Sequence, residues 1–260
     1  MQINKNLKLI IFCFIVFLSL DSHTDDGFSI SAVIETPQVE INGNADDPAI
    51  WFNEVDPSLS IVFGTDKYNG VYSYNLSGDV IGFSKSGSMN NIDLRTLNDN
   101  TYIFTTDSSN NTVNVWVYKN SYLHNKSKEG SFALDKIPHH TSKVNFLAYG
   151  LCGGLSQKDE VIIFVTEAKG PGVQLWKFDD VKLSLLNTFN NSNAYESEGC
   201  VFDDENQKFF ISEENKKGVI RSYSLTNKLL LDNKFRIDDR DGNITGDPEG
   251  LAILKTSKHE

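Results

Sequence analysis

Short apolar runs alternate with polar clusters along most of the chain. Runs rich in Val, Ile, Phe, Tyr and Trp are separated by groups of Asn, Asp, Gly and Ser, and helical periodicity is nearly absent. This pattern is typical of many short β-strands joined by turns. It predicts strands at residues 60–64, 71–76, 102–106, 113–118, 161–166, 173–178, 208–212 and 219–225.

The predicted strands fall into a repeat. Each unit opens with a polar residue beside a small apolar strand, then continues through a polar turn, a strongly apolar strand, a second polar loop and an aromatic-bearing strand. The units begin at Asp46, Asn90, Tyr149, Glu198 and Asp247. Their spacing is typical of four-stranded propeller blades. We therefore expect an all-β propeller, with four to five blades in this chain.

The last repeat unit is short. Only residues 251–254 of it form an apolar strand, and the sequence stops at Glu260. An open propeller leaves unpaired sheet edges and exposed blade faces. We therefore expect the C-terminal blades of a closed ring to be missing.

The N-terminus has a different composition. Lys5 and Lys8 precede an apolar run at residues 9–20, which is followed by a polar exit at 21–24. This is the layout of a secretory signal peptide. No later stretch approaches the length of a transmembrane helix. The sequence predicts a signal peptide at 1–22, a propeller domain at 28–260, and an exported protein, periplasmic or extracellular, without a membrane span after cleavage.

The chain is strongly acidic. Its formal charge is −11, and loss of residues 1–20 removes two lysines and gives −13. Nucleic acids and anionic membranes bind to basic surfaces, so both are disfavoured as partners of this chain. Divalent cations are compatible with its acidic surface. Two cysteines remain in the domain, Cys152 and Cys200. In an oxidising compartment they could form a disulfide, and buried free thiols are the alternative.

Acidic residues recur at equivalent places in the repeat. They stand where an inner strand opens or where an apolar strand ends: Asp46, Asp47, Asp93, Glu198, Glu213, Glu214, Asp247 and Glu249. Taken singly, each is explained as a turn former or a surface residue. Taken as a set on radial blades, they converge at one end of the channel, where carboxylates repel unless they share a cation. Hard oxygen ligands favour Ca²⁺.

Other residues add little independent chemistry. Lys67 is a lone cation that could contact phosphate, Tyr149 is either a core aromatic or a hydroxyl donor, and Asp203–Asp204 predicts a turn. No Ser, His or Cys nucleophile motif is present. A hydrolase built on these residues would use a metal-activated water.

At these residues the chain resembles the β-propeller phytases, which are six-bladed calcium enzymes that hydrolyse phytate. The resemblance rests on motifs in the family's order: DDPAIW (46–51), GTDKYNG (64–70), NNIDLR (90–95), YGLC (149–152), SEGCVFDDE (197–205), ISEEN (211–215) and DPEGLAI (247–253). It implies calcium ligands at Glu35, Asp46, Asp47, Asn91, Asp93, Glu198, Glu214, Asp247 and Glu249. It also implies catalytic roles for Lys67, Tyr149 and Glu214, with phytate or calcium–phytate as substrate. We expect a monomer.

Two positions depart from the family's pattern. Tyr68 stands where a second lysine is common, and Ser109 stands about where an arginine often contacts phosphate. These departures keep two alternatives open. One is a non-catalytic or decayed exported propeller fragment that binds calcium. The other is a different metal-dependent enzyme, such as a lactonase, on a similar wheel.

Overall fold

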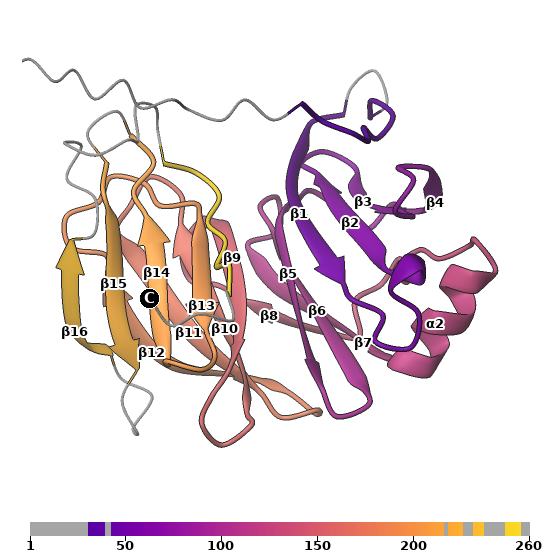
Figure 1. Ribbon diagram of the computed structural model, residues 1–260. Helices are drawn as coiled ribbons and strands as arrows, with labels where there is room; N and C mark the ends of the chain where they lie inside the picture. The colour runs from indigo at the N-terminus through magenta and orange to yellow at the C-terminus, as the bar shows by residue number, and fades with distance from the viewer. Residues whose placement is uncertain (1–30, 40–42, 216–217, 226–230, 237–247, 256–260) are drawn as a thin grey trace, which may run out of the picture. The chain divides into compact units, whose positions relative to one another are not determined.

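The computed structural model describes residues 31–39, 43–215, 218–225, 231–236 and 248–255, and the chain from residue 34 onward forms one compact unit. Four antiparallel sheets, each of four strands in chain order, account for most of it (Figure 1). The first two sheets are β1 (Ala45–Trp51), β2 (Ile61–Asp66), β3 (Gly70–Tyr74), β4 (Val80–Ser84), and β5 (Met89–Leu97), β6 (Asn100–Asp107), β7 (Thr112–Lys119), β8 (His140–Lys143). The next two are β9 (Ala148–Leu155), β10 (Val161–Glu167), β11 (Gly172–Phe178), β12 (Leu183–Asn190), and β13 (Cys200–Asp203), β14 (Lys208–Ser212), β15 (Ile220–Leu225), β16 (Leu231–Arg236).

These sheets confirm the all-β prediction and its repeat. The eight predicted strands coincide with the second and third strands of the four sheets. The first strands β1, β5, β9 and β13 contact one another in series, as the inner strands of propeller blades do. A 3₁₀ turn, η1 (Pro57–Leu59), and a nine-residue helix, α2 (Asn120–Lys128), interrupt the strands. The sequence pattern did not predict α2, most of whose residues are polar.

The second strands of the two middle sheets, β6 and β10, are apolar on both faces because each lies between two neighbouring sheets. In β6, Ile103 packs toward the first sheet, whereas Tyr102 and Phe104 pack toward the third. In β10, Ile163 packs toward the second sheet and Phe164 toward the fourth. Successive strand residues point to opposite faces, so one continuous apolar run contributes to two cores. Three such cores join the four sheets.

A hydroxyl residue followed by an acid ends the second strand of every sheet. The pairs are Thr65–Asp66, Thr106–Asp107, Thr166–Glu167 and Ser212–Glu213. Each hydroxyl donates a hydrogen bond to a backbone carbonyl at the opening of the next unit, on Asn90, Tyr149, Ser197 and Glu249 in turn. The fourth bond places the segment 248–255 where the earlier units have the opening of their inner strand. This recurring bond therefore links each sheet to its successor.

Two glycines bring the openings of neighbouring units close together. A Cβ at Gly150 would lie 1.9 Å from the carbonyl oxygen of Glu198, and one at Gly199 would lie 1.6 Å from that of Glu249. Any side chain at either position would clash with backbone, which explains the glycine in YGLC and SEGC. The spacing of the inner strands at this end depends on both residues.

Cys152 on β9 and Cys200 on β13 form a disulfide, with their Cα atoms 5.7 Å apart. Of the two alternatives left by the sequence, the structure has the disulfide. The bond joins the inner strands of the third and fourth sheets across 48 residues of sequence.

The predicted signal peptide at 1–22 and the domain boundary at residue 28 lie outside the described residues. Within the described part of the chain, no helix is long and apolar enough to cross a bilayer.

Candidate active site

One end of the inner strands gathers most of the predicted site residues. Asp46 and Asp47 lie in β1, Asn91 lies in β5, Tyr149 lies in β9, and Glu198 precedes β13 by two residues. Each inner strand pairs antiparallel with the second strand of its sheet. The residues after those second strands, such as Lys67 and Glu214, therefore come back to the same end. Repeat and register together bring side chains from four sheets into contact.

Lys67 is at the centre of this group. Its Nζ lies 2.9 Å from Asp46 Oδ1 and 3.5 Å from Glu198 Oε1, and 5.7 Å from the centroid of the Tyr149 ring. Its side chain is about one-quarter exposed. Burial alone would lower its pKa, but hydrogen bonding to Asp46 and the negative charge of Glu198 raise it instead. Lys67 is therefore a fixed positive charge between carboxylates of two different sheets.

Tyr149 links this group to a third carboxylate. Its hydroxyl donates to Glu214 Oε2 at 2.9 Å. Burial and the negative charges of Glu198 and Glu214 raise the pKa of the phenol far above its ordinary value. The phenol therefore keeps its proton and acts as a hydrogen-bond donor at any physiological pH.

Asp47 and Asn91 face the axis between the inner strands. Both line a cavity of about 250 Å³ whose wall also includes Leu151, Cys200 and Leu251. Asp47 Oδ2 accepts from the backbone N–H of Ile92 at 3.0 Å. Burial raises the pKa of Asp47 to about 7, although hydrogen bonds from Ile92 and Asn91 oppose the rise. A carboxylate in this environment has a strong requirement for a compensating positive charge.

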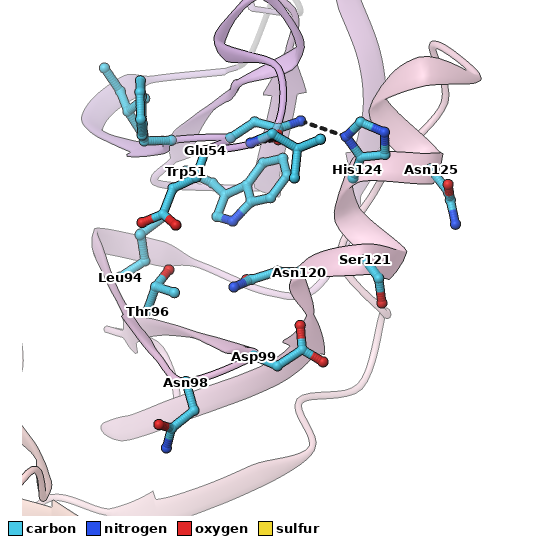
Figure 2. A pocket seen from close by; sticks show the side chains of 14 residues that line it. Trp51, Glu54, Leu94, Thr96, Asn98, Asp99, Asn120, Ser121, His124 and Asn125 are labelled. Carbon is cyan, nitrogen blue, oxygen red and sulfur yellow. Dashed lines mark hydrogen bonds between the residues drawn. The ribbon is translucent and has the colours of Figure 1, made fainter.

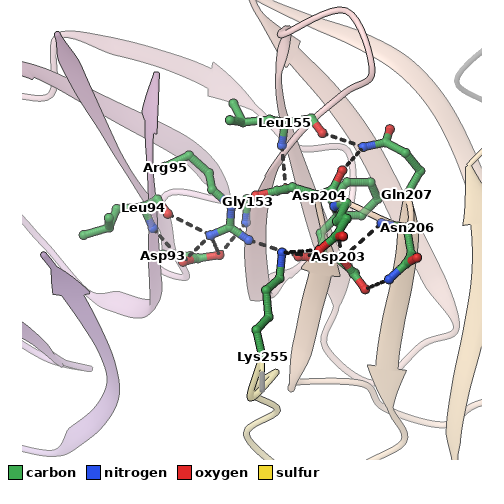
Figure 3. Close-up of polar contacts among 12 residues, drawn as sticks. Asp93, Leu94, Arg95, Gly153, Leu155, Asp203, Asp204, Asn206, Gln207 and Lys255 are labelled. Atoms are coloured by element: carbon green, nitrogen blue, oxygen red, sulfur yellow. Dashed lines mark hydrogen bonds and ion pairs between the residues drawn. The ribbon is translucent and has the colours of Figure 1, made fainter. Parts of the chain in front are cut away.

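Asp93, a predicted calcium ligand, has other partners in the structure (Figure 3). Arg95 Nη1 lies 3.1 Å from both of its carboxylate oxygens, and the backbone N–H of Gly153 donates to Oδ2 at 2.8 Å. Arg95 Nε donates to Asp204 Oδ2 at 3.0 Å, and Asp204 Oδ1 accepts from Leu155 N at 2.8 Å. This Arg95 network joins the second, third and fourth sheets. Asp93 is thus paired with Arg95 on its own strand and bonded to the backbone of the third sheet, while its charge contributes to the raised pKa of Asp47.

The remaining predicted ligands differ in placement. Glu35 is exposed, and its carbonyl lies beside Gly78, in the turn between β3 and β4. That turn is at the opposite end of the first sheet, so Glu35 is not brought to the group. Glu249 lies near it, because its charge raises the pKa of both Asp46 and Glu214. Asp247 lies outside the described residues.

Of the two remaining acids, Asp203 has its predicted turn role and Glu213 has a different partner from the one expected. Asp203 accepts hydrogen bonds from the backbone N–H groups of Glu205 and Asn206 at 3.0 and 3.1 Å, as predicted for a turn. Glu213, counted among the converging acids, instead pairs with Arg221 at 3.1 Å.

The donor set is suited to a hard cation. Burial is the largest cause that raises the pKa of Asp46 and of Glu214, and the charges of Glu198 and Glu249 raise both further. Lys67 lowers the pKa of Asp46, and Tyr149 lowers that of Glu214, so each shift is partly offset. Negative charge is therefore in excess, and the available atoms are carboxylate, amide and phenol oxygens, which Ca²⁺ prefers. In the described part of the chain, no three acidic, His or Cys side chains lie around a common point in a metal-binding arrangement. Instead, Lys67 bridges Asp46 and Glu198.

The sequence reading missed two residues that organise this region. Asn90 Nδ2 donates to Glu198 Oε1 at 3.2 Å and to Asn91 Oδ1 at 2.6 Å. Its position was available as a signal, since Asn90–Asn91 in the second unit corresponds to Asp46–Asp47 in the first. Arg95 had no such signal, because its partner Asp204 is distant in sequence.

Comparison with known proteins gives three results. A family model described as Phytase matches residues 6–260. A 3-phytase of Bacillus subtilis (strain 168) is 26% identical over 242 residues, which cover 87% of this chain and 60% of the relative. The chain therefore spans about 60% of the length of the curated relative it matches. Among solved structures, dihydro-heme d1 dehydrogenase NirN in complex with DHE matches with a TM-score of 0.45 and 12% identity, over 71% of this chain and 37% of that one.

Proposed function

The chain belongs to the phytase family, and on that basis we propose that it hydrolyses phosphate monoesters of phytate with calcium as the metal. The observation that carries this proposal is the position of Lys67 between Asp46 and Glu198, beside the Tyr149–Glu214 pair. A cation among carboxylates from different sheets is the arrangement expected where an anionic substrate and divalent cations share one site.

Calcium ions would be held by Asp46, Asp47, Asn91, Glu198, Glu214 and Glu249. Asp93 and Glu35 are weaker candidates, because the first pairs with Arg95 and the second lies beside the turn at Gly78. When bound, calcium would neutralise phosphate charge and supply an activated water as nucleophile.

The chain's own residues bind and orient the ester. Lys67 contributes a point charge that can move from Asp46 to a phosphate oxygen. Tyr149, which stays protonated, donates a hydrogen bond and holds Glu214 in place. Glu214, with a pKa raised by burial and by neighbouring carboxylates, is suited to accept a proton near neutral pH.

The charge of the site selects the substrate class. A polyphosphorylated ester such as phytate would meet an excess of carboxylates, so binding requires cations between the two. Calcium–phytate is therefore the form we expect to bind. Export is consistent with the Cys152–Cys200 disulfide, since disulfides persist in oxidising compartments.

A non-catalytic calcium-binding propeller is the second candidate, and two side chains favour it. Tyr68 is 64% exposed, and Ser109 donates to Ser88 Oγ at 2.7 Å. Neither supplies the positive charge that the family resemblance implies at these positions.

Phosphate release separates the two candidates. The purified mature protein is incubated with phytate in calcium and then with a chelator, and free phosphate is measured. We expect release in calcium and loss of release with the chelator. Absence of release by a folded, calcium-binding protein would support the non-catalytic alternative, and release that persists in chelator would contradict calcium dependence.

A further inference from the structure

A second cavity lies at the opposite end of the first two sheets. It has a volume of about 560 Å³ and is formed by the ends of β1 and β5, the turn after β5 and helix α2 (Figure 2). β1 carries Asp46 and Asp47 near its start and ends here at Trp51. At about 3.3 Å per residue, Asp46 and Trp51 are roughly 17 Å apart along the strand. The volume is within the range of small-molecule sites.

Trp51 supplies a hydrogen-bond donor that lacks a protein acceptor among the described residues. The residue is 2% exposed and packs in the core between the first two sheets. Its ring borders the cavity between Glu54 and Asn120 in Figure 2. The other tryptophans differ: Trp116 donates to the carbonyl of Asp135 at 2.8 Å, and Trp176 donates to Gln174 Oε1 at 3.1 Å.

The indole N–H of Trp51 has no hydrogen-bond partner among the described residues. Among the described residues, Ser73 Oγ is the fully buried side-chain polar atom without a partner, so the Trp51 N–H is open to the cavity that Trp51 lines, where a ligand acceptor can reach it.

Further polar groups around the cavity are held ready by their own contacts. Asn53 Oδ1 accepts from the backbone N–H groups of Val55 and Asp56, which fixes its amide so that Nδ2 donates to His124 Nδ1 at 3.0 Å. The free Nε2 of His124 is then the donor. Asn120 Oδ1 accepts from Thr101 at 2.6 Å, which leaves its amide N–H groups available.

Acceptors balance these donors. The carboxylate of Glu54 makes no ion pair or side-chain hydrogen bond within the described ranges, and Asp99 is paired with the exposed Lys119 at 3.6 Å. Two carboxylates and one already paired lysine repel phosphate and other anions. The lining therefore differs in chemistry from a phosphate site.

We propose that this cavity binds a neutral, polyhydroxylated ligand of the size of a mono- or disaccharide. A hydroxyl group both donates and accepts, so one sugar can accept from the Trp51 N–H and donate to Glu54 at the same time. Its C–H face can pack against the partly buried Leu94, which lines the same wall.

Saturation-transfer NMR and calorimetry with maltose and glucose test the proposal. We expect maltose to bind with a Kd of about 1 mM. Glu54→Gln changes an exposed side chain and leaves the core intact, and we expect it to weaken maltose binding about tenfold. Trp51→Phe removes the indole N–H, and we expect a loss of the same size. Glu129→Gln, the same change outside the cavity, is the matched control and should bind as the parent does. Lys67→Met should also leave maltose binding unchanged.

Each opposite result overturns the proposal. Absence of transfer to both sugars rules out a polyol ligand. If tetramethylammonium binds more tightly than maltose, the carboxylates of Glu54 and Asp99 recognise an organic cation and not a sugar. If Glu54→Gln and Trp51→Phe leave sugar binding unchanged, the sugar binds somewhere other than this cavity.

Discussion

The two ends of the inner strands solve the problem of buried polar groups differently. At the opening end, Asp46 of the first sheet and Glu198 and Glu214 of the fourth compete for the single charge of Lys67 and the single proton of Tyr149. At the closing end, Asp93 and Asp204 have Arg95 between them and backbone N–H groups on the remaining oxygens. Unsatisfied charge marks the end where a cation and an anionic ester would bind, and satisfied charge marks the end that holds the sheets together.

The closing end is itself divided. Between the second, third and fourth sheets it is filled by the Arg95 network, whereas between the first and second sheets it holds the cavity with the unpaired indole of Trp51. The same strands thus carry a crowded cluster of carboxylates around Lys67 at one end and, at the other, a cavity lined by hydrogen-bonding groups with the carboxylates of Glu54 and Asp99 among them. The difference follows from which side chains have partners within the protein.

The largest expected effect concerns the disulfide, which spans the inner strands near the opening end. In the chain-entropy model, closing a loop of this length stabilises the folded state by about 4 kcal/mol. Replacing Cys152 and Cys200 by Ala should lower the free energy of unfolding by roughly this amount, measured by urea titration. Reductant should destabilise the parent and have no effect on the variant. Equal stability of the two proteins would contradict this role.

Next, Arg95→Met should destabilise the fold by about 3 kcal/mol, because it leaves two partly buried carboxylates unpaired. Phosphate release per folded molecule should change less than in Lys67→Met, since the partners of Arg95 are Asp93, Leu94, Phe202 and Asp204 and none of these contacts Lys67. Urea unfolding and the phytate assay are compared on the same preparations. A selective loss of activity with unchanged stability would show that the two ends are not separable in this way.

At the opening end, Lys67→Met should reduce phosphate release about 100-fold, which corresponds to about 2.7 kcal/mol of transition-state stabilisation. Stability should also fall, because the change removes the positive charge that offsets the repulsion between Asp46 and Glu198, so phosphate release is compared per folded molecule. Lys158→Met, in the exposed turn after β9, is the control. Full activity of the Lys67 variant would remove this residue from the site.

A smaller effect is expected from Thr166→Val. Thr166 is fully buried, and its hydroxyl donates to the carbonyl of Ser197, just before Glu198. Leaving that carbonyl unpaired should cost about 1–2 kcal/mol, measured by urea unfolding. Thr188→Val, the same change at an exposed position of β12, should be near neutral. Similar losses in both variants would indicate a general cost of the substitution.

The smallest effect involves pH. Burial would raise the pKa of Asp203, but hydrogen bonds from Asn206 and the backbone of Glu205 lower it overall. A lowered folded-state pKa gives stability that is present above the unfolded value of about 3.9 and is lost as pH falls below it. Asp203→Asn should therefore lower the urea midpoint slightly at pH 7, and its difference from the parent should narrow as pH falls below about 3.9. A difference in urea midpoint between variant and parent that grows as pH falls would contradict the lowered pKa of Asp203.

Much of the fold was predictable because its signals are local. Alternating apolar and polar runs located the strands, and their recurrence gave the propeller-like arrangement. The register of Asp46, Asn90, Tyr149 and Glu198 in the repeat also predicted that these residues would meet, because equivalent positions of radial sheets lie at one end. Helix α2 was missed, since its polar sequence has little amphipathic pattern.

Contacts between distant residues were not predictable in the same way. Asp93 has the same repeat position and charge that suggested calcium, but Arg95 and Gly153 occupy its oxygens. Glu35 was expected beside the other ligands, and its segment lies instead against the turn at Gly78. Both outcomes depend on how neighbouring sheets and segments pack, which no local pattern encodes.

The sequence by itself determined the strands, the repeat, the acidic character and the set of residues at the opening end, because hydrophobic periodicity and repeat register act over short distances. The tertiary structure decided which carboxylates remain in excess beside Lys67, which one is neutralised by Arg95, whether Cys152 and Cys200 pair, and that the Trp51 N–H faces a cavity without a protein acceptor. Those outcomes depend on side chains from different sheets lying within hydrogen-bond distance. Only the packing of the sheets against one another sets those distances.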